Sequence, residues 1–264
     1  MGFSGWSAGA VEFFQGLQAD NTKAYWGAHK AFFEASVREP MAELLGELSG
    51  EFGPGRIARP YRDMRFRAGD SPYKTEIYAT LDRGGYVRLS ANGLTAALGY
   101  LMMTTAQLGR YRHAVDDETE GAQLAGVVER LRAEGLEVGG GQALKSAPRG
   151  YPKDHPRVEL LRYKGLICWQ HWPTAPWLYT AKAKDHVVGF LRIAAPLHHW
   201  LDQKVGPRSR LTNPAARGWP AWSMGVSAAH SDQPRLQPNV PSGEDLACLN
   251  AADARWTWTA GAED

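Results

Sequence analysis

The sequence has only two cysteines among its 264 residues. Cys168 and Cys248 lie far apart, so they form neither a disulfide framework nor the closely paired spacing of a metal knuckle. Two isolated cysteines are most simply free thiols in a reducing compartment. The cysteine content therefore argues against a disulfide-stapled secreted domain and favours a cytoplasmic protein.

The sequence also lacks a strong net charge and long apolar runs. Its formal net charge is +2 and its isoelectric point is near 8.5, which argues against wholesale nucleic-acid binding, because that function usually requires a frankly basic domain. No apolar run approaches the ~20 residues that a membrane helix needs. The amino-terminal stretch MGFSGWSAGAVEFF has neither the basic start nor the continuous apolar core of a signal peptide. We expect no membrane attachment.

The common catalytic signatures are missing as well. The sequence contains no HExxH, no paired CxxC, no GxSxG elbow and no P-loop, which disfavours metalloproteases, hydrolases and NTPases. The triple glycine at 139–141 is not followed by the Lys-Ser/Thr of a phosphate loop, and we interpret it as a flexible link. His198 and His199 are adjacent and cannot bind one metal together on a helix. We therefore predict no metal and no cofactor.

Apolar periodicity predicts several helices. Mean hydropathy is −0.40 and hydrophobic content 44%, as in an ordinary water-soluble chain that can form one good core. A first helix starts after Ser7, and a longer one runs from Thr22 towards Ser49 with an interruption at Pro40. Further helices are expected over 104–115, 123–133, 158–163 and, as a pair divided near Pro196, 185–205.

Strand patterns fill the region between these helices. The dipeptide Asn92-Gly93 predicts a two-residue hairpin turn that pairs Ala91 with Leu94, Leu89 with Ala96 and Val87 with Leu98. A second hairpin is expected from 61–67 and 73–81, and another strand over 166–171.

Together the patterns predict an α+β fold: an antiparallel meander of about four or more strands packed against several helices. We expect one domain over residues 1–206. The Pro-, Ala-, Gly- and Ser-rich residues 207–264 should form a low-complexity, disordered tail.

Positive charge is concentrated in one stretch, Arg59–Thr75 (RPYRDMRFRAGDSPYKT), which holds four arginines and one lysine against two aspartates. A single near carboxylate, Asp63, cannot neutralise three neighbouring arginines, so the surplus needs water or an anion. Arginine is suited to bidentate capture of carboxylate or phosphate groups. The stretch therefore favours an anion-binding site.

The same stretch carries a family resemblance. Arg59-x-x-Arg62-Asp63-x-Arg65-Phe66, followed by Ser71-Pro72-Tyr73-Lys74-Thr75, resembles the signature of the bacterial and fungal family called domain of unknown function 2461. The resemblance spans about residues 3–205 and includes KSAPRGYPKDHP at 145–156 and PLHHWLDQKV at 196–205. Members carry Asp-Lys or Asn-Lys before Ser-Pro-Tyr, whereas this chain has Gly69-Asp70. The resemblance implies no established activity.

The proline-stiffened loop 145–156 supplies further polar candidates for the same site. We interpret the protein as binding a small phosphorylated or carboxylated ligand, with an enzymatic role left open. The expected anion anchors are Arg59, Arg62, Arg65, Lys74, Arg88 and Arg149. The expected catalytic groups are Asp63, which would orient the arginines, and Tyr73 or His155 as proton donor.

Two alternatives remain open at this point. The Arg–Asp cluster could be a purely structural network that touches no ligand. The protein could instead be a non-catalytic module that contacts a partner protein or a nucleic-acid backbone through the same basic surface. The sequence leaves the oligomeric state open.

Overall fold

The structure is a computed structural model that describes residues 2–62 and 71–206. The tip of the basic hairpin, residues 63–70, lies outside the described residues. The tail predicted to be disordered, residues 207–264, also lies outside them, so the domain boundary at residue 206 remains a prediction. The described residues all belong to one unit of the chain.

In this part of the chain, six strands form one antiparallel sheet with the order β1-β2-β3-β4-β6-β5. The strands are β1 (Gly55–Ile57), β2 (Glu76–Leu81), β3 (Gly85–Ser90), β4 (Gly93–Tyr100), β5 (Glu137–Gly139) and β6 (Leu166–Trp172). The first four follow one another as a meander, and β6 adds beside β4 with β5 outside it. The sheet with its helices confirms the predicted α+β fold.

The predicted hairpin between β3 and β4 exists, but its predicted register is wrong. The strands pair Ser90 with Gly93 and Leu89 with Leu94, so Ala91 and Asn92 form the loop. Gly93 has a φ of +118°, and a Cβ there would lie 2.2 Å from the carbonyl oxygen of Trp172 in β6. Gly93 is therefore required inside the strand by the neighbouring β6, not at the tip of the turn. The register differs by two residues, which leaves each side chain on its predicted face.

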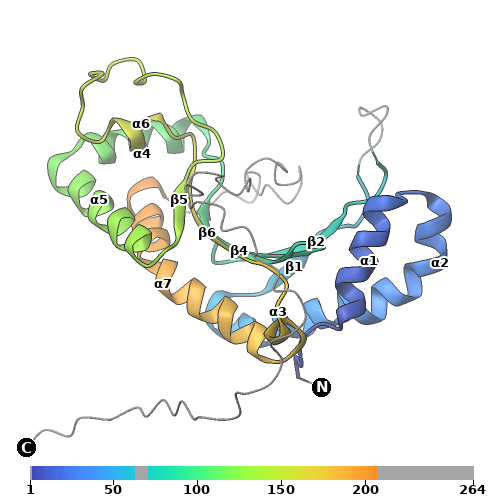
Figure 1. The fold of residues 1–264 in the computed structure, drawn as a ribbon. Coiled ribbons are helices and arrows are strands. Elements are labelled where there is room, and N and C mark those ends of the chain that lie inside the picture. The colour runs from blue at the N-terminus through green and yellow to red at the C-terminus, as the bar shows by residue number, and fades with distance from the viewer. Residues whose placement is uncertain (1, 63–70, 207–264) are drawn as a thin grey trace, which may run out of the picture. The chain divides into compact units, whose positions relative to one another are not determined.

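Helices cover one face of the sheet (Figure 1). Helix α7 (Lys182–Val205) packs on β4 and β6, α3 (Glu39–Phe52) on β1 and β2, and α1 (Ala8–Ala19) on β3. The strands present alternate apolar residues to them, all buried: Ile77, Ala79, Val87, Leu89, Leu94, Ala96 and Leu98. Burial of this face is the main source of fold stability.

The predicted long helix after Thr22 is interrupted at Pro40, as expected. Helix α2 (Lys23–Phe33) continues through a π-helical segment, η1 (Glu34–Arg38), into α3, and Pro40 lies in the first turn of α3. Proline lacks an N–H and collides with the carbonyl four residues earlier, so one wider turn accommodates it. The apolar residues whose helical spacing in the sequence predicts this helix are all buried: Trp26, Phe33, Val37, Leu44, Leu45 and Leu48.

The remaining helices are α4 (Thr105–Asp116), α5 (Glu118–Ala133), α6 (Val158–Arg162) and the short 3-10 helix η3 (Pro176–Tyr179). Helices α4 and α5 pack on α7, α5 also contacts β5, and α6 packs on α4. The helix η3 packs on the amino-terminal part of α7, where Trp177 stacks on His186. Helix α5 begins five residues before the predicted start because the Asp117 carboxylate accepts hydrogen bonds from the N–H groups of Thr119 and Glu120.

The predicted division at Pro196 is wrong. Helix α7 is continuous for 24 residues and contains Pro196 in its interior. Its apolar stripe is buried on both sides of the proline, from Val187 and Leu191 to Leu197 and Leu201. Burying four such side chains contributes more than the roughly 3 kcal/mol that an interior proline costs.

The triple glycine at 139–141 is not a flexible link. Gly139 pairs with Ile167 at the edge of the sheet. A Cβ on Gly140 would lie 2.6 Å from the carbonyl oxygen of Gly165, and one on Gly141 2.7 Å from a methyl of Leu101. These glycines permit close packing of chain segments.

Candidate functional site

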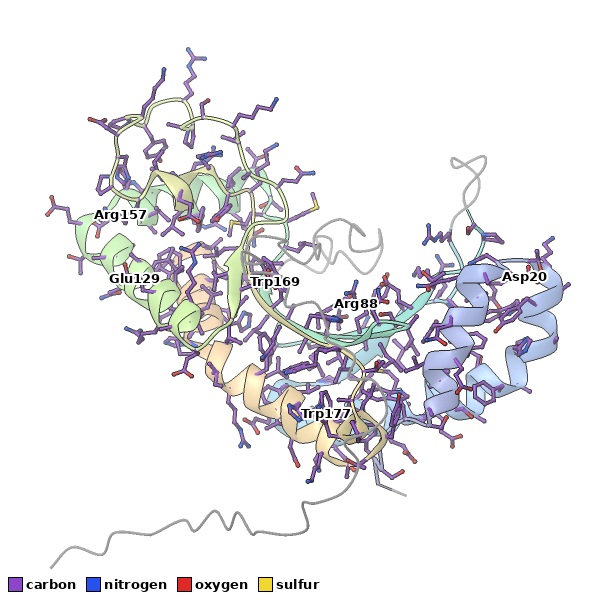
Figure 2. All side chains as sticks on the ribbon, viewed as in Figure 1. Asp20, Arg88, Glu129, Arg157, Trp169 and Trp177 are labelled. Carbon is purple, nitrogen blue, oxygen red and sulfur yellow. The ribbon has the colours of Figure 1, made fainter. Side chains whose placement is uncertain are left out.

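The face of the sheet opposite α7 and α3 carries a row of polar side chains. The register pairs Tyr78 of β2 with Arg88 of β3, Arg88 with Thr95 of β4, and Thr95 with His171 of β6. Directly paired residues of an antiparallel sheet point to the same face. Four neighbouring strands therefore place these four side chains in one line, and Figure 2 shows Arg88 on this side of the sheet. We call Lys74, Glu76, Tyr78, Arg88, Thr95 and His171 the polar row.

Hydrogen bonds connect the members of this row. Arg88 Nη1 donates to Glu76 Oε2 at 3.2 Å, and Arg88 Nη2 donates to Thr95 Oγ1 at 3.1 Å. Thr95 Oγ1 lies 3.0 Å from His171 Nδ1. Thr95 is fully buried, and the Arg88 side chain is only 12% exposed. The guanidinium is thus held in one orientation by partners on the two strands that flank β3.

His171 is the last member of the polar row. Thr95 Oγ1 accepts a hydrogen bond from Arg88 and lies 3.0 Å from His171 Nδ1, and it donates to that nitrogen in the tautomer that carries its proton on Nε2. Burial and the nearby charge of Arg88 lower the pKa of His171 below its usual value, which favours the neutral ring.

Lys74 extends the row towards the basic hairpin. Its Nζ donates to the carbonyl oxygen of Arg59 at 2.7 Å and to the phenolic oxygen of Tyr78 at 3.2 Å. Burial lowers the pKa of Lys74; Glu76 opposes this shift, whereas the positive charges of Arg59 and Arg62 add to it. Burial and the Glu76 carboxylate raise the pKa of Tyr78 to about 12, so its phenol stays protonated.

The base of the basic hairpin is attached to the amino-terminal helices. Tyr61 and Tyr73 form an isolated antiparallel bridge. The predicted pairing of strand 73–81 with 61–67 is wrong within the described residues, because Gly55–Ile57 of β1 pairs with Ala79–Leu81 of β2. Asn21 holds both backbone groups of Tyr73: its Nδ2 donates to the carbonyl at 3.1 Å and its Oδ1 accepts from the N–H at 3.0 Å. The Tyr73 ring stacks on Trp26 with centroids 4.6 Å apart. These contacts position Lys74, the next residue.

The residues expected at the site from the sequence fall into separate groups. Arg59 is exposed and Arg62 half-buried, and both act electrostatically on Lys74. Tyr73 lies in the core, 7% exposed. Arg88 lies in the polar row. The proposed catalytic Asp63 and the anchor Arg65 lie outside the described residues.

The structure does not bring the loop 145–156 to the polar row. His155 Nε2 lies 3.2 Å from Asp116 Oδ1 at the end of α4, and His155 Nδ1 accepts from the N–H of Arg157 at 3.0 Å. Arg149 is exposed on the same loop. This loop leads from β5 towards α6, at the opposite edge of the sheet from β1 (Figure 1). His155 and Arg149 therefore belong to a different surface from Lys74 and Arg88.

Sequence reasoning did not assign a role to Glu76, Tyr78, Thr95 or His171. Alternation within each strand identifies their polar face, and the spacing of two residues puts Lys74 and Glu76 on the same side. The order of strands was the missing information, because only the neighbouring position of β4 and β6 places His171 beside Thr95.

Three further findings concern metal binding, membrane crossing and the free cysteine. Among the described residues, no group of three or more His, Cys, Asp and Glu side chains is arranged to hold a metal ion. No helix in residues 2–62 and 71–206 is long and apolar enough to cross a membrane. Cys168 is a buried free thiol whose pKa burial raises to about 12, so it is unreactive at neutral pH.

Comparison with known proteins gives one family match. A family model described as conserved hypothetical protein (DUF2461) matches residues 9–200. No curated protein and no solved structure matches the chain.

Proposed function

The chain belongs to the conserved hypothetical protein family DUF2461, and from its structure we propose that the polar row binds a small anionic ligand. The ligand carries a phosphate or carboxylate group. Arg88 and Lys74 are its principal anchors, and Arg59 and Arg62 at the hairpin base add positive charge. The cytoplasmic location favoured by the cysteine content is part of the same proposal.

The single observation that carries the proposal is the orientation of Arg88. Two hydrogen bonds, from its two terminal nitrogens to Glu76 and Thr95, hold the guanidinium on a rigid sheet. A preoriented guanidinium loses little conformational freedom when it binds an anion, so more of the interaction energy remains as affinity. Partial burial strengthens each charged hydrogen bond because the local dielectric constant is lower than in water.

The balance of charge supports the same conclusion. In the described part of the chain, the charges that act on Lys74 are those of Glu76, Arg59 and Arg62. One carboxylate thus stands against two guanidiniums and the ammonium itself. A second negative group would relieve this excess of positive charge, and an anionic ligand would supply it.

The proposal is tested by titration calorimetry and thermal shift with inorganic phosphate, sugar phosphates, nucleotides and dicarboxylates. We expect one class to bind saturably, and Arg88→Lys to weaken it at least tenfold, because a charged hydrogen bond is worth about 1.5–3 kcal/mol. Lysine keeps the charge but loses the planar fork, so the variant tests orientation specifically.

Arg192→Lys is the matched control. Arg192 also makes a two-nitrogen contact with a carboxylate, Glu51, but on the exposed surface of α7. It should leave ligand affinity unchanged. If no anion distinguishes Arg88→Lys from the wild-type protein, the proposal is wrong. Salt-sensitive binding of nucleic acids of any sequence would instead support the polymer-binding alternative.

A further inference from the structure

We propose that Lys74 is a nucleophile that forms an imine with an oxo acid held at the polar row. The inference rests on the proposed function, because the anionic group of the ligand is what the cationic side chains hold. It adds a substrate class, compounds that carry both a carbonyl and a carboxylate, and it gives Lys74 a chemical role beyond attraction of charge.

The Lys74 amine is held in a fixed position. Nζ is fixed by two contacts, the carbonyl oxygen of Arg59 at 2.7 Å and the phenolic oxygen of Tyr78 at 3.2 Å. It also lies 4.7 Å from the centroid of the Tyr78 ring. An exposed lysine samples many rotamers, whereas this amine is held at one place just before the start of β2.

The surroundings of this amine lower its pKa. Partial burial disfavours the ammonium form, Glu76 opposes this effect, and the positive charges of Arg59 and Arg62 add to it. The net result is a lowered pKa of Lys74, which increases the fraction of free amine. The same guanidiniums attract a carboxylate, so the groups that activate the amine also bring the substrate to it.

Lys74 and Tyr78 supply the groups that imine formation needs, a nucleophilic amine and a proton donor. The free amine of Lys74 attacks the carbonyl carbon, a proton moves from the attacking nitrogen to the carbonyl oxygen, and a neutral carbinolamine forms. Its hydroxyl then leaves as water, with a proton donated by the Tyr78 phenol, which remains protonated because its pKa is raised to about 12. This step leaves a protonated imine between Nζ and the former carbonyl carbon beside the Tyr78 phenolate, and the proton on Nζ returns to Tyr78 to give the neutral imine.

Borohydride trapping of the full-length protein tests the inference. The protein is incubated near neutral pH with glyoxylate, pyruvate or 2-oxoglutarate and reduced with sodium borohydride, which converts an imine to a stable secondary amine. Peptide mapping by mass spectrometry then locates the adduct. We expect labelling of Lys74 at least about tenfold above the other lysines, because the cationic groups raise the local concentration of the oxo acid.

Lys184 and Lys204 are internal controls in the same digest. Each contacts a carboxylate, Glu47 and Glu120 respectively, which favours the ammonium form. Lys74→Arg should remove the selective adduct and leave the background labelling unchanged. Even labelling of all lysines in the wild-type protein would overturn the inference without any variant.

A non-reactive anion separates this inference from the proposed function. Succinate and inorganic phosphate cannot form an imine but can occupy the anion site. If one of them stabilises the protein in an Arg88-dependent manner while no oxo acid labels Lys74, the nucleophile is refuted and the anion site stands. If no anion stabilises the protein, the proposed function itself fails.

Discussion

Thr95→Val tests whether the polar row acts as one connected network. Valine has nearly the same shape as threonine and is equally suited to a strand, so the substitution replaces the hydroxyl with a methyl group and changes little else. Thr95 is fully buried in the centre of the sheet. Its loss removes the hydrogen bonds that the hydroxyl makes with Arg88 Nη2 and His171 Nδ1.

The expected cost follows from these two hydrogen bonds. A lost hydrogen bond costs about 1–1.5 kcal/mol and one to a charged group more, so the free energy of unfolding should fall by about 2–3 kcal/mol. For a domain of this size, the midpoint temperature should fall by about 4–12 °C. Equilibrium unfolding in urea and calorimetry measure the two quantities.

Thr80→Val is the matched control. Thr80 lies on the same face in β2, is 6% exposed, and its hydroxyl makes no hydrogen bond with the described residues. This substitution should change stability by less than about 0.5 kcal/mol. A double-mutant cycle of Thr95→Val with Arg88→Met should give a coupling of at least about 0.5 kcal/mol. If Thr95→Val is as harmless as Thr80→Val, the network contributes no stability.

Three other changes probe separate parts of the fold. The pKa of His171 is lowered on folding, so the unfolded chain binds the imidazole proton more readily than the folded chain does. The contribution of neutral His171 to stability is therefore full above about pH 6.5 and is lost as pH falls through the folded pKa. His171→Gln should reduce the dependence of the free energy of unfolding on pH, measured by urea titrations from pH 7 to 5. Asn21→Ala should cost about 2–3 kcal/mol and speed amide exchange at Tyr73, because Asn21 holds both backbone groups of that residue. Pro196→Ala should raise the free energy of unfolding by about 1–3 kcal/mol, since Pro196 is exposed within α7.

Each of these has a contrary outcome that would count against its reasoning. An unchanged pH slope in His171→Gln would show that the ring titrates equally in the folded and unfolded chains. Unchanged exchange at Tyr73 in Asn21→Ala would show that the stacking on Trp26 alone fixes the hairpin base. A loss of stability in Pro196→Ala would show that the packing of α7 depends on the backbone geometry around the proline.

Local patterns predicted the elements well where a single segment decides the outcome. The apolar stripe from Trp26 to Leu48 identifies a helix, and each predicted inward residue is buried. Alternation identified the strands and separated their apolar and polar faces. These signals succeed because helix and strand periods belong to the segment itself.

Predictions failed where a neighbour from elsewhere in the chain decides. The register at Gly93 depends on the Trp172 carbonyl of β6, which no local turn rule includes. The continuity of α7 through Pro196 depends on a buried stripe on both sides of the proline. In both positions tertiary packing outweighs a local preference of a few kcal/mol.

The sequence by itself determined the class of fold, the two faces of the sheet and the concentration of positive charge in Arg59–Thr75, because composition and periodicity are local properties. Only the tertiary structure decided which polar residues meet. It joined Glu76, Arg88, Thr95 and His171 through the order of four strands, and it placed His155 beside Asp116 on another surface. The physical reason is that a site made from several strands depends on their pairing, which long-range burial of apolar surface selects.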